Sequence, residues 1–263
     1  MRRTTVVFAL VVSLVAVACS KKDGAKEGSG NQTSVRVAAA SDLAKAFNEV
    51  GAAFAKKTGI TPSFDFGSSG LFAKQIEQGA PFYLYAAANK SFVDQVVKSG
   101  KCDASTAQLY SRGRLVMWGK NGTPMKIEEL ADPKYKRIGI ANPEHAPYGK
   151  AAVESMQKAG IYDQVKDRLV LAENVLAAAT YAKEGSVDVS FFALSLAIAN
   201  NTESYVQIAP DLHTPLEQTM VVCGKGAEAD AARELAGFIV GDEGRAIMEK
   251  YGFSTTGVAS QPK

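Results

Sequence analysis

The sequence of 263 residues is poor in the side chains that most catalytic and metal sites require. It has two isolated histidines, His145 and His213, and three cysteines that form no CxxC pair. It shows no nucleophile elbow, no cluster with metal-ligand spacing and no carboxylate pair at a telling spacing. We therefore expect that the protein is not an enzyme, and that each histidine is a surface or packing residue.

A strong charge of one sign is also missing. Residues 35–263 hold 25 basic and 25 acidic side chains, and no run of basic residues interrupts them. Proteins that bind nucleic acid usually carry a basic patch or stripe. The charge balance therefore argues against nucleic acid as a ligand.

No apolar run reaches the length of about 20 residues that a membrane-spanning helix needs. Residues 1–18 instead predict a signal peptide, with Arg2 and Arg3 before a shorter apolar stretch. Cys19 follows small residues in a pattern that resembles the bacterial lipobox, so we predict that Cys19 is lipidated; an ordinary cleaved signal with an incidental cysteine is the alternative. Residues 19–34 hold the Cys and a Gly-, Ser- and Lys-rich segment, which predicts a flexible tether.

The other two cysteines, Cys102 and Cys223, could pair in an oxidising compartment. They lie far apart in the sequence, and nothing in the sequence fixes the geometry that a disulfide needs. Two buried free thiols are the alternative, and the sequence leaves the choice open.

What the sequence does contain is a repeated alternation of strand-like and helix-like segments, which appears once before and once after Trp118. Before Trp118 the expected strands cover residues 34–40, 61–66 and 83–88, each followed by a helix. After it, strands at 137–141, 170–172 and 187–191 alternate with helices in the same way. This alternation predicts an α/β fold with two Rossmann-like lobes and mostly parallel sheets. We expect strands at 114–119 and 219–223 to cross between the lobes, which gives lobe one as 35–115 plus 219–263 and lobe two as 116–218.

Four polar turns stand where an expected strand ends and a helix begins, at residues 38–41, 67–70, 146–149 and 173–175. A helix start leaves about four backbone N–H groups without intrahelical partners and carries roughly half a positive charge. Ligands of open α/β sheets bind beyond the carboxyl ends of the strands. Four such starts that converge, two from each lobe, would therefore form an anion site without Lys or Arg.

Simpler interpretations exist for single residues in these turns. Ser41 alone would most simply be an N-cap of the following helix. Asp42, at the first helical position, is expected to point to solvent and to favour the helix dipole. Lys74 and Lys150 lie one turn into their helices, and neither is expected to contact the anion.

These segments together resemble the periplasmic molybdate-binding proteins of ABC transporters, within the type II periplasmic-binding-protein family. The resemblance runs from about residue 35 to residue 253 and is carried by residues 37–43, 66–70, 75–76, 79–81, 142–149, 173–175, 192–195, 241–248 and 251–253. It implies two lobes that close on a tetrahedral oxyanion, molybdate or tungstate, which is bound as transported ligand with no cofactor.

The resemblance also implies the ligand-binding residues. The hydroxyl and N–H groups of Ser41 and Ser69 would bind from lobe one, and the backbone N–H groups of Tyr148 and Val175 from lobe two. All four would contact the oxygens of the anion, and none would ligate the metal atom directly. One branch of the family adds a tyrosine hydroxyl where this sequence has Ala193, and Tyr148 is the candidate replacement.

The sequence departs from the family pattern at Tyr83 and Asn89, where acidic residues are usual. These departures bear on anion preference more than on fold. The expected function is an extracytoplasmic substrate-binding lipoprotein that delivers the oxyanion to the inner-membrane permease of an ABC importer. We expect a monomer, anchored by its lipid on the periplasmic or cell-surface side of the cytoplasmic membrane. The alternatives are the same fold with sulfate, phosphate or an organic anion, or a lipoprotein that senses an anion.

Overall fold

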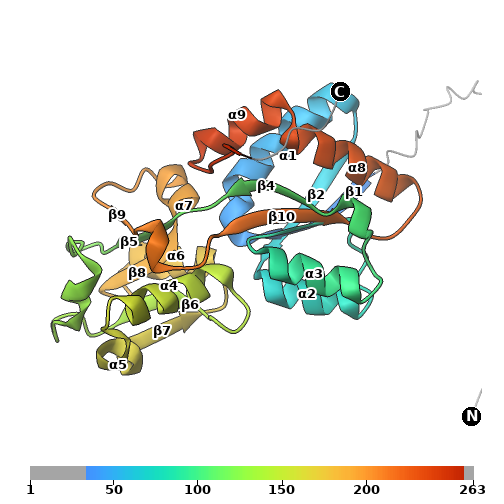
Figure 1. Ribbon diagram of the computed structural model, residues 1–263. Coiled ribbons are helices and arrows are strands. Elements are labelled where there is room, and N and C mark those ends of the chain that lie inside the picture. The colour runs from blue at the N-terminus through green and yellow to red at the C-terminus, as the bar shows by residue number, and fades with distance from the viewer. Residues whose placement is uncertain (1–33, 258–263) are drawn as a thin grey trace, which may run out of the picture. The chain divides into compact units, whose positions relative to one another are not determined.

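The computed structural model describes residues 34–257 (Figure 1). The expected signal peptide, the lipidation site Cys19 and all of the tether except Ser34 lie outside the described residues. Within residues 34–257 no helix combines the length and the apolar character that crossing a membrane requires.

The first sheet has five strands in the order β2-β1-β3-β10-β4. Strands β1 (Ser34–Ala40), β2 (Thr61–Gly67) and β3 (Leu84–Ala87) are parallel, while β10 (Glu217–Val222) runs antiparallel to β3 and to β4 (Gln108–Arg112). Alternate side chains of β1 face opposite layers, as a strand requires. Val37 packs on the side of α1 (Ala44–Thr58) and α8 (Ala227–Val240), whereas Ala38 packs on the side of α2 (Ser69–Glu77) and α3 (Lys90–Lys98) (Figure 1).

Helix α1 shows how directly the sequence specifies these layers. Its buried residues Phe47, Val50 and Phe54 recur at helical spacing, and its last turn holds Lys56 and Lys57, which favour the negative end of the dipole. Gly59 ends the helix in the left-handed region with φ of 78°, a conformation that glycine adopts without steric cost. The final helix, α9 (Asp242–Lys250), packs against α1 and α8.

The second sheet also has five strands, in the order β7-β6-β8-β5-β9. Strand β6 (Ile138–Ala141) is parallel to β7 (Leu169–Ala172) and β8 (Val189–Ala193), and β5 (Leu115–Trp118) is antiparallel to β8 and to β9 (Val206–Gln207). Helices α4 (Pro147–Lys158) and α6 (Val175–Glu184) pack on β6 and β8. Short helices α5 (Tyr162–Val165) and α7 (Leu194–Ala199) follow α4 and β8 in the chain.

Two connections join the sheets, which confirms the expected fold of two α/β lobes joined by two crossings. The first runs from β4 to β5 through Gly113 and Arg114, and the second runs from β9 to β10. Gly113 N donates to Leu216 O at 2.9 Å, so the two connections are bonded to each other. The expectation that the strands at 114–119 and 219–223 themselves cross is wrong, because β5 belongs wholly to the second sheet and β10 wholly to the first, and the chain crosses just before each of them.

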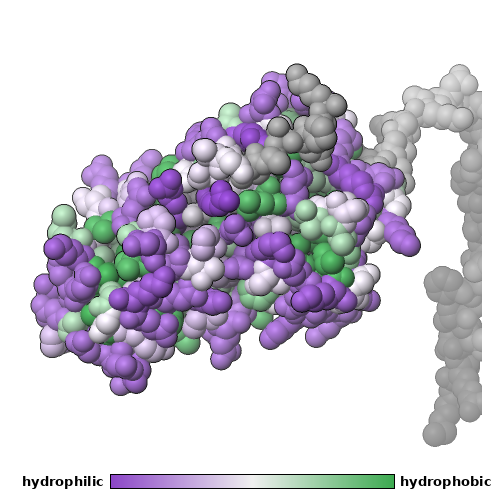
Figure 2. Space-filling model, viewed as in Figure 1, coloured by the Kyte–Doolittle hydropathy of each residue, from purple (hydrophilic) through white to green (hydrophobic). Residues whose placement is uncertain are grey.

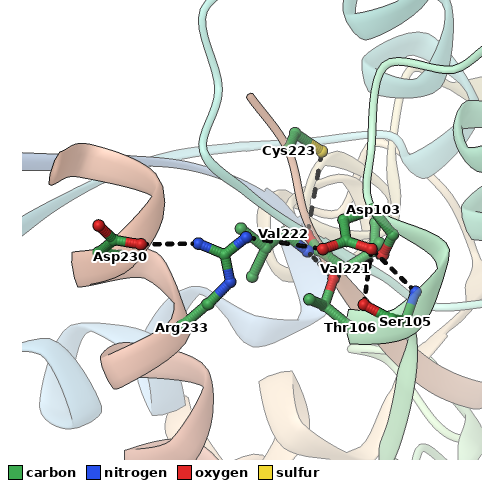
Figure 3. A network of polar contacts seen from close by, with 8 residues as sticks. All are labelled: Asp103, Ser105, Thr106, Val221, Val222, Cys223, Asp230 and Arg233. Carbon is green, nitrogen blue, oxygen red and sulfur yellow. Dashed lines mark hydrogen bonds and ion pairs between the residues drawn. The ribbon is translucent and has the colours of Figure 1, made fainter. Parts of the chain in front are cut away.

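A disulfide joins Cys102 to Cys223 and resolves the choice that the sequence left open. The bond ties the segment after α3 to the end of β10, and several polar contacts reinforce this junction (Figure 3). Val222 N donates to Thr106 Oγ1 at 2.9 Å, and Arg233 on α8 pairs with Asp103 at 3.6 Å. The junction therefore connects three segments of the first lobe that are distant in the sequence.

The apolar residues of both lobes are largely buried. On the face in view, hydrophilic residues predominate and the hydrophobic ones form small patches (Figure 2). Among the described residues, the exposed large hydrophobic side chains are Met125, Leu171 and Leu176.

Candidate anion site between the lobes

A small cavity lies where the four polar turns meet. Residues of both lobes line it: Ala40, Ser41, Asp42, Gly67, Ser68, Ser69, Ala88, Ala146, Pro147, Tyr148 and Val175. Its volume is about 10 Å³, roughly the space that one water molecule needs. The four residues that the sequence singled out, Ser41, Ser69, Tyr148 and Val175, therefore share one cavity.

Three α-helices begin at this cavity. Helix α2 begins at Ser69, α4 at Pro147 and α6 at Val175, and the short 3-10 helix Ser41–Leu43 follows β1. The backbone N–H groups of Ser69, Tyr148 and Val175 lie in the first turns of their helices and have no intrahelical acceptor. The helix dipoles add positive potential at the same place. The site therefore combines hydrogen-bond donors and positive potential, and none of the described residues that line it is Lys or Arg.

Ser41 reaches across to the other lobe instead of capping its own helix. Its Oγ donates to Asn174 Oδ1 at 3.2 Å and accepts from Leu176 N at 3.3 Å. The cap position before the 3-10 helix is occupied by Ala40, with no side-chain cap bond. Asn174 caps α6 by accepting from Ala177 N at 3.0 Å. The N-cap interpretation of Ser41 is thus wrong, and Ser41 connects lobe one to the start of α6.

Ser69 is held from within its own lobe. Its Oγ accepts from Ala88 N at 3.1 Å, and its carbonyl accepts from Tyr85 OH at 2.6 Å. Because Oγ serves as an acceptor in the first bond, the hydroxyl hydrogen is free to act as a donor toward the cavity.

Ser68 and His145 form a contact between the lobes that the sequence analysis did not anticipate. Ser68 Oγ donates to His145 O at 2.5 Å and lies 2.8 Å from His145 Nδ1. Gly70 N donates to the same carbonyl at 2.9 Å. The sequence predicts that His145 is a surface or packing residue, and in the structure it is half-buried in this contact. Its role was invisible in the sequence because its partners lie more than 70 positions away.

Asp42 points inward, which makes the expectation that it faces solvent wrong. The residue is 1% exposed, and its Oδ2 accepts from Tyr148 OH at 3.0 Å and from Gln218 Nε2 at 2.7 Å. Its carbonyl accepts from Ser195 Oγ of lobe two at 2.8 Å. Burial raises the pKa of the Asp42 carboxyl to about 7, although the hydrogen bond from Tyr148 lowers it.

Tyr148 lines the cavity, and its hydroxyl donates to Asp42 Oδ2. The side chain is buried, and burial together with the Asp42 carboxylate raises the pKa of the phenol well above its usual value. A side chain at Gly113 would collide with this contact, because a Cβ there would lie 2.1 Å from Tyr148 OH. The crossing from β4 to β5 therefore runs directly beside the Asp42–Tyr148 bond.

The positions that depart from the family pattern lie outside the cavity lining. Asn89 caps α3 by accepting from Ser91 N at 2.7 Å, and a Cβ on Gly224 would lie 3.3 Å from the ring of Tyr83. Ala193 ends β8 and is buried. A second cavity of about 590 Å³ beside Trp118, Lys120 and Lys183 is larger, but among residues 34–257 its lining includes no first-turn residue of an α-helix. The smaller cavity is therefore the candidate anion site.

The fold and the convergent helix starts define a solute-binding protein, and the comparisons with known families agree. Residues 35–254 match the family model described as bacterial extracellular solute-binding protein, and the chain belongs to this family. The described residues hold no group of three or more His, Cys, Asp or Glu side chains that could bind a metal ion.

The chain is similar to several named proteins. The molybdate-binding protein ModA of Rhodobacter capsulatus is 34% identical over 84% of this chain and 88% of its own length. The putative ABC transporter substrate-binding lipoprotein YvgL of Bacillus subtilis is 26% identical over 94% of this chain and 96% of its own. Among solved structures, the periplasmic molybdate-binding protein of Azotobacter vinelandii superposes with a TM-score of 0.79 at 26% identity, covering 83% of this chain and 98% of that one.

Proposed function

We propose that this protein captures molybdate or tungstate outside the cytoplasm and delivers it to the permease of an ABC importer. The observation that carries the proposal is the meeting of Ser41, Ser69, Tyr148 and Val175, two from each lobe, at one cavity lined by helix starts. The relation to the Rhodobacter capsulatus protein supports this choice of ligand.

The chemistry of the site suits a fully ionised tetrahedral anion. Such an anion accepts hydrogen bonds and donates none, so backbone N–H and Ser O–H groups satisfy it completely. Hydrogen bonds to a charged acceptor are about twice as strong as neutral ones. Fixed dipoles also balance the charge without the desolvation that burying a Lys or Arg requires.

Anion entry requires the lobes to move. Most of the residues that line the cavity are buried, so the contacts between the lobes must open for an anion to enter and form again around it. These contacts are the bonds of Ser41 with Asn174, Ser68 with His145 and Asp42 with Tyr148. We propose that the two lobes move about the two crossings by hinge closure. The expected bounds at 115 and 218 shift slightly, because Leu115 lies in β5 of the second sheet and Glu217 and Gln218 lie in β10 of the first.

The remaining features of the proposal concern location and partners. We propose that residues 1–18 direct export and that Cys19 carries a lipid that anchors the protein outside the cytoplasmic membrane. The name of the Bacillus subtilis relative, a putative lipoprotein, supports this part. We further propose that the protein acts as a monomer, that it has no catalytic activity and that its partner is the inner-membrane permease.

Calorimetry on residues 32–263, which contain both lobes, tests the ligand. We expect tight binding of molybdate and tungstate and much weaker binding of sulfate and phosphate. Tight binding of sulfate or phosphate, with molybdate weak, would reject the assigned ligand and favour the alternative anion receptor. Absence of binding for all four anions would reject the oxyanion site itself.

Gly70→Ala is expected to weaken molybdate binding while leaving the free energy of unfolding unchanged or higher. A Cβ at Gly70 would lie 2.9 Å from Cα, Cβ and O of His145 in the other lobe, so the lobes could not close fully. The overpacking is worth about 1–3 kcal/mol, or roughly 5- to 150-fold in affinity. Inside α2, alanine is meanwhile favoured over glycine by about 1 kcal/mol.

Gln75→Ala, at an exposed position of the same helix, is the matched control for this variant. Calorimetry and urea unfolding of both variants make the comparison. Equal molybdate affinity in Gly70→Ala and Gln75→Ala would contradict the role of the Gly70–His145 contact in closure.

A further inference from the structure

Asp42 is a buried carboxyl group in the wall of a cavity that we assign to an anion. Its Oδ2 accepts two hydrogen bonds, from Tyr148 OH and Gln218 Nε2. Its Oδ1 is buried and has no hydrogen-bond partner among the described residues. An ionised carboxylate in this place would be desolvated on one oxygen and would repel a neighbouring dianion.

Among the residues that the structure describes, no cation compensates the Asp42 charge. The titratable groups that face it are the phenols of Tyr148 on α4 and Tyr110 on β4, and burial raises the pKa of both phenols, so both are neutral. Helix α7 carries no ionisable side chain, and β10 offers the amide of Gln218. The other charged side chains on the surrounding elements are paired elsewhere, exposed or at the far end of a helix. The ion pairs are Glu49 with Lys250, Asp65 on β2 with Arg36, Lys150 on α4 with Glu154 and Glu217 on β10 with Arg112. Lys45 on α1 is exposed, and Lys183 and Glu184 lie at the end of α6.

We propose that Asp42 takes up one proton from solvent when the lobes close on the anion, so that one anion and one proton are captured together. This inference rests on the proposed oxyanion function and assigns its regulation. The proton binds Oδ1, because Oδ2 already accepts two hydrogen bonds. No covalent bond other than this O–H forms or breaks, and the proton returns to solvent when the lobes open.

Lobe closure couples proton uptake by Asp42 to anion binding. The Asp42 side chain belongs to lobe one, and its bond to Tyr148 OH and its carbonyl bond from Ser195 Oγ both reach lobe two. Opening of the lobes breaks these contacts and exposes the carboxyl group to water, where the charged form is favoured. Closure around a dianion favours the protonated form of Asp42 for two reasons. Burial desolvates the carboxyl group, and protonation removes the repulsion between the carboxylate and the dianion.

The direction of the pH dependence follows. In the closed protein the pKa of Asp42 is raised to about 7, and a bound dianion raises that pKa further. The anion-bound protein therefore holds more protons than the free protein, and affinity falls as pH rises. The dissociation constant should increase by up to tenfold for each pH unit in which the bound protein keeps the proton and the free protein has lost it.

The test is calorimetry of molybdate binding by residues 32–263 from pH 6 to pH 9, in pairs of buffers that differ in ionisation enthalpy. The wild-type protein is expected to take up between one-half and one proton per molybdate near pH 7.5, with the dissociation constant rising as stated. Asp42→Asn is expected to bind molybdate with no proton uptake and with a flat pH profile. Asp65→Asn, an exposed aspartate on β2, is the matched control and is expected to behave as wild type.

The outcomes separate this inference from the proposed function. Molybdate binding by the wild-type protein without proton uptake overturns the inference and leaves the oxyanion function standing; this measurement does not depend on whether Asp42→Asn folds. Proton uptake that persists in Asp42→Asn overturns the assignment to Asp42. Absence of molybdate binding at every pH overturns the proposed function itself.

Discussion

Replacing Ser41 and Ser69 together by alanine is expected to weaken molybdate binding by roughly 10²- to 10⁴-fold. Both serines line the cavity; Ser69 would give its hydroxyl hydrogen to a charged oxygen, and Ser41 would do so in place of its bond to Asn174 Oδ1. A hydrogen bond to a charged group is worth about 1.5–3 kcal/mol, so two of them give about 3–6 kcal/mol, at about 1.4 kcal/mol per factor of ten. Calorimetry on residues 32–263 measures the change directly.

The structure supplies a control for this double variant. Ser155 is buried in α4, and its hydroxyl donates only to the backbone carbonyl of Ala151. Ser155→Ala should therefore leave the affinity unchanged. Loss of Ser69 Oγ also removes the acceptor of Ala88 N, so circular dichroism must show that the double variant is folded. A folded double variant with wild-type affinity would contradict the assignment of both residues.

Removal of the disulfide by Cys102→Ala with Cys223→Ala is expected to lower the free energy of unfolding by about 2–4 kcal/mol. The bond closes a loop of 121 residues, and a cross-link over a long loop restricts the unfolded chain strongly. Urea unfolding of the oxidised wild type and the variant gives the difference. The shared polar contacts around Val222 and Thr106 keep the native segments in place without the bond (Figure 3).

Wild-type protein unfolded in the presence of a reductant is the matched control, and it should unfold at the same urea concentration as the variant. Molybdate affinity should be unaffected, because neither cysteine lines the anion cavity. An unchanged unfolding midpoint in the variant would mean that the cross-link contributes nothing to stability.

The sequence predicted the layered fold well wherever hydrophobic periodicity was strong. Strand β1, helix α1 and helix α8 were expected within a few residues of their observed bounds. Strand β4 (Gln108–Arg112) was not expected. Only Leu109 and Tyr110 in it are large and apolar, and the strand lies at the edge of its sheet, where it pairs with β10 and, through Arg112, with Ser254. An edge strand needs no continuous apolar run, so its sequence carried no signal of its own.

The sequence predicted the features of the site that depend on neighbouring residues, but not the contacts between residues that are distant in the chain. The helix starts at Ser69 and Val175 follow from residues that are adjacent in the chain. The partners of Asp42 lie 106 and 176 positions away, at Tyr148 and Gln218, and no periodicity connects them. The expected first helical position predicted that Asp42 points to solvent, but the chain forms a 3-10 turn from Ser41 to Leu43 before α1, and all three residues of the turn are buried.

The order of the strands has a practical consequence. Strand β1, at the start of the described chain, and helices α8 and α9, near its end, all pack within the first lobe. The second lobe is formed by the segment between β4 and β10. A dye, a tag or a surface linkage at either end of the described chain is therefore carried by the same half of the molecule. A pair of labels that is meant to report the distance between the halves must place one of them on an internal loop.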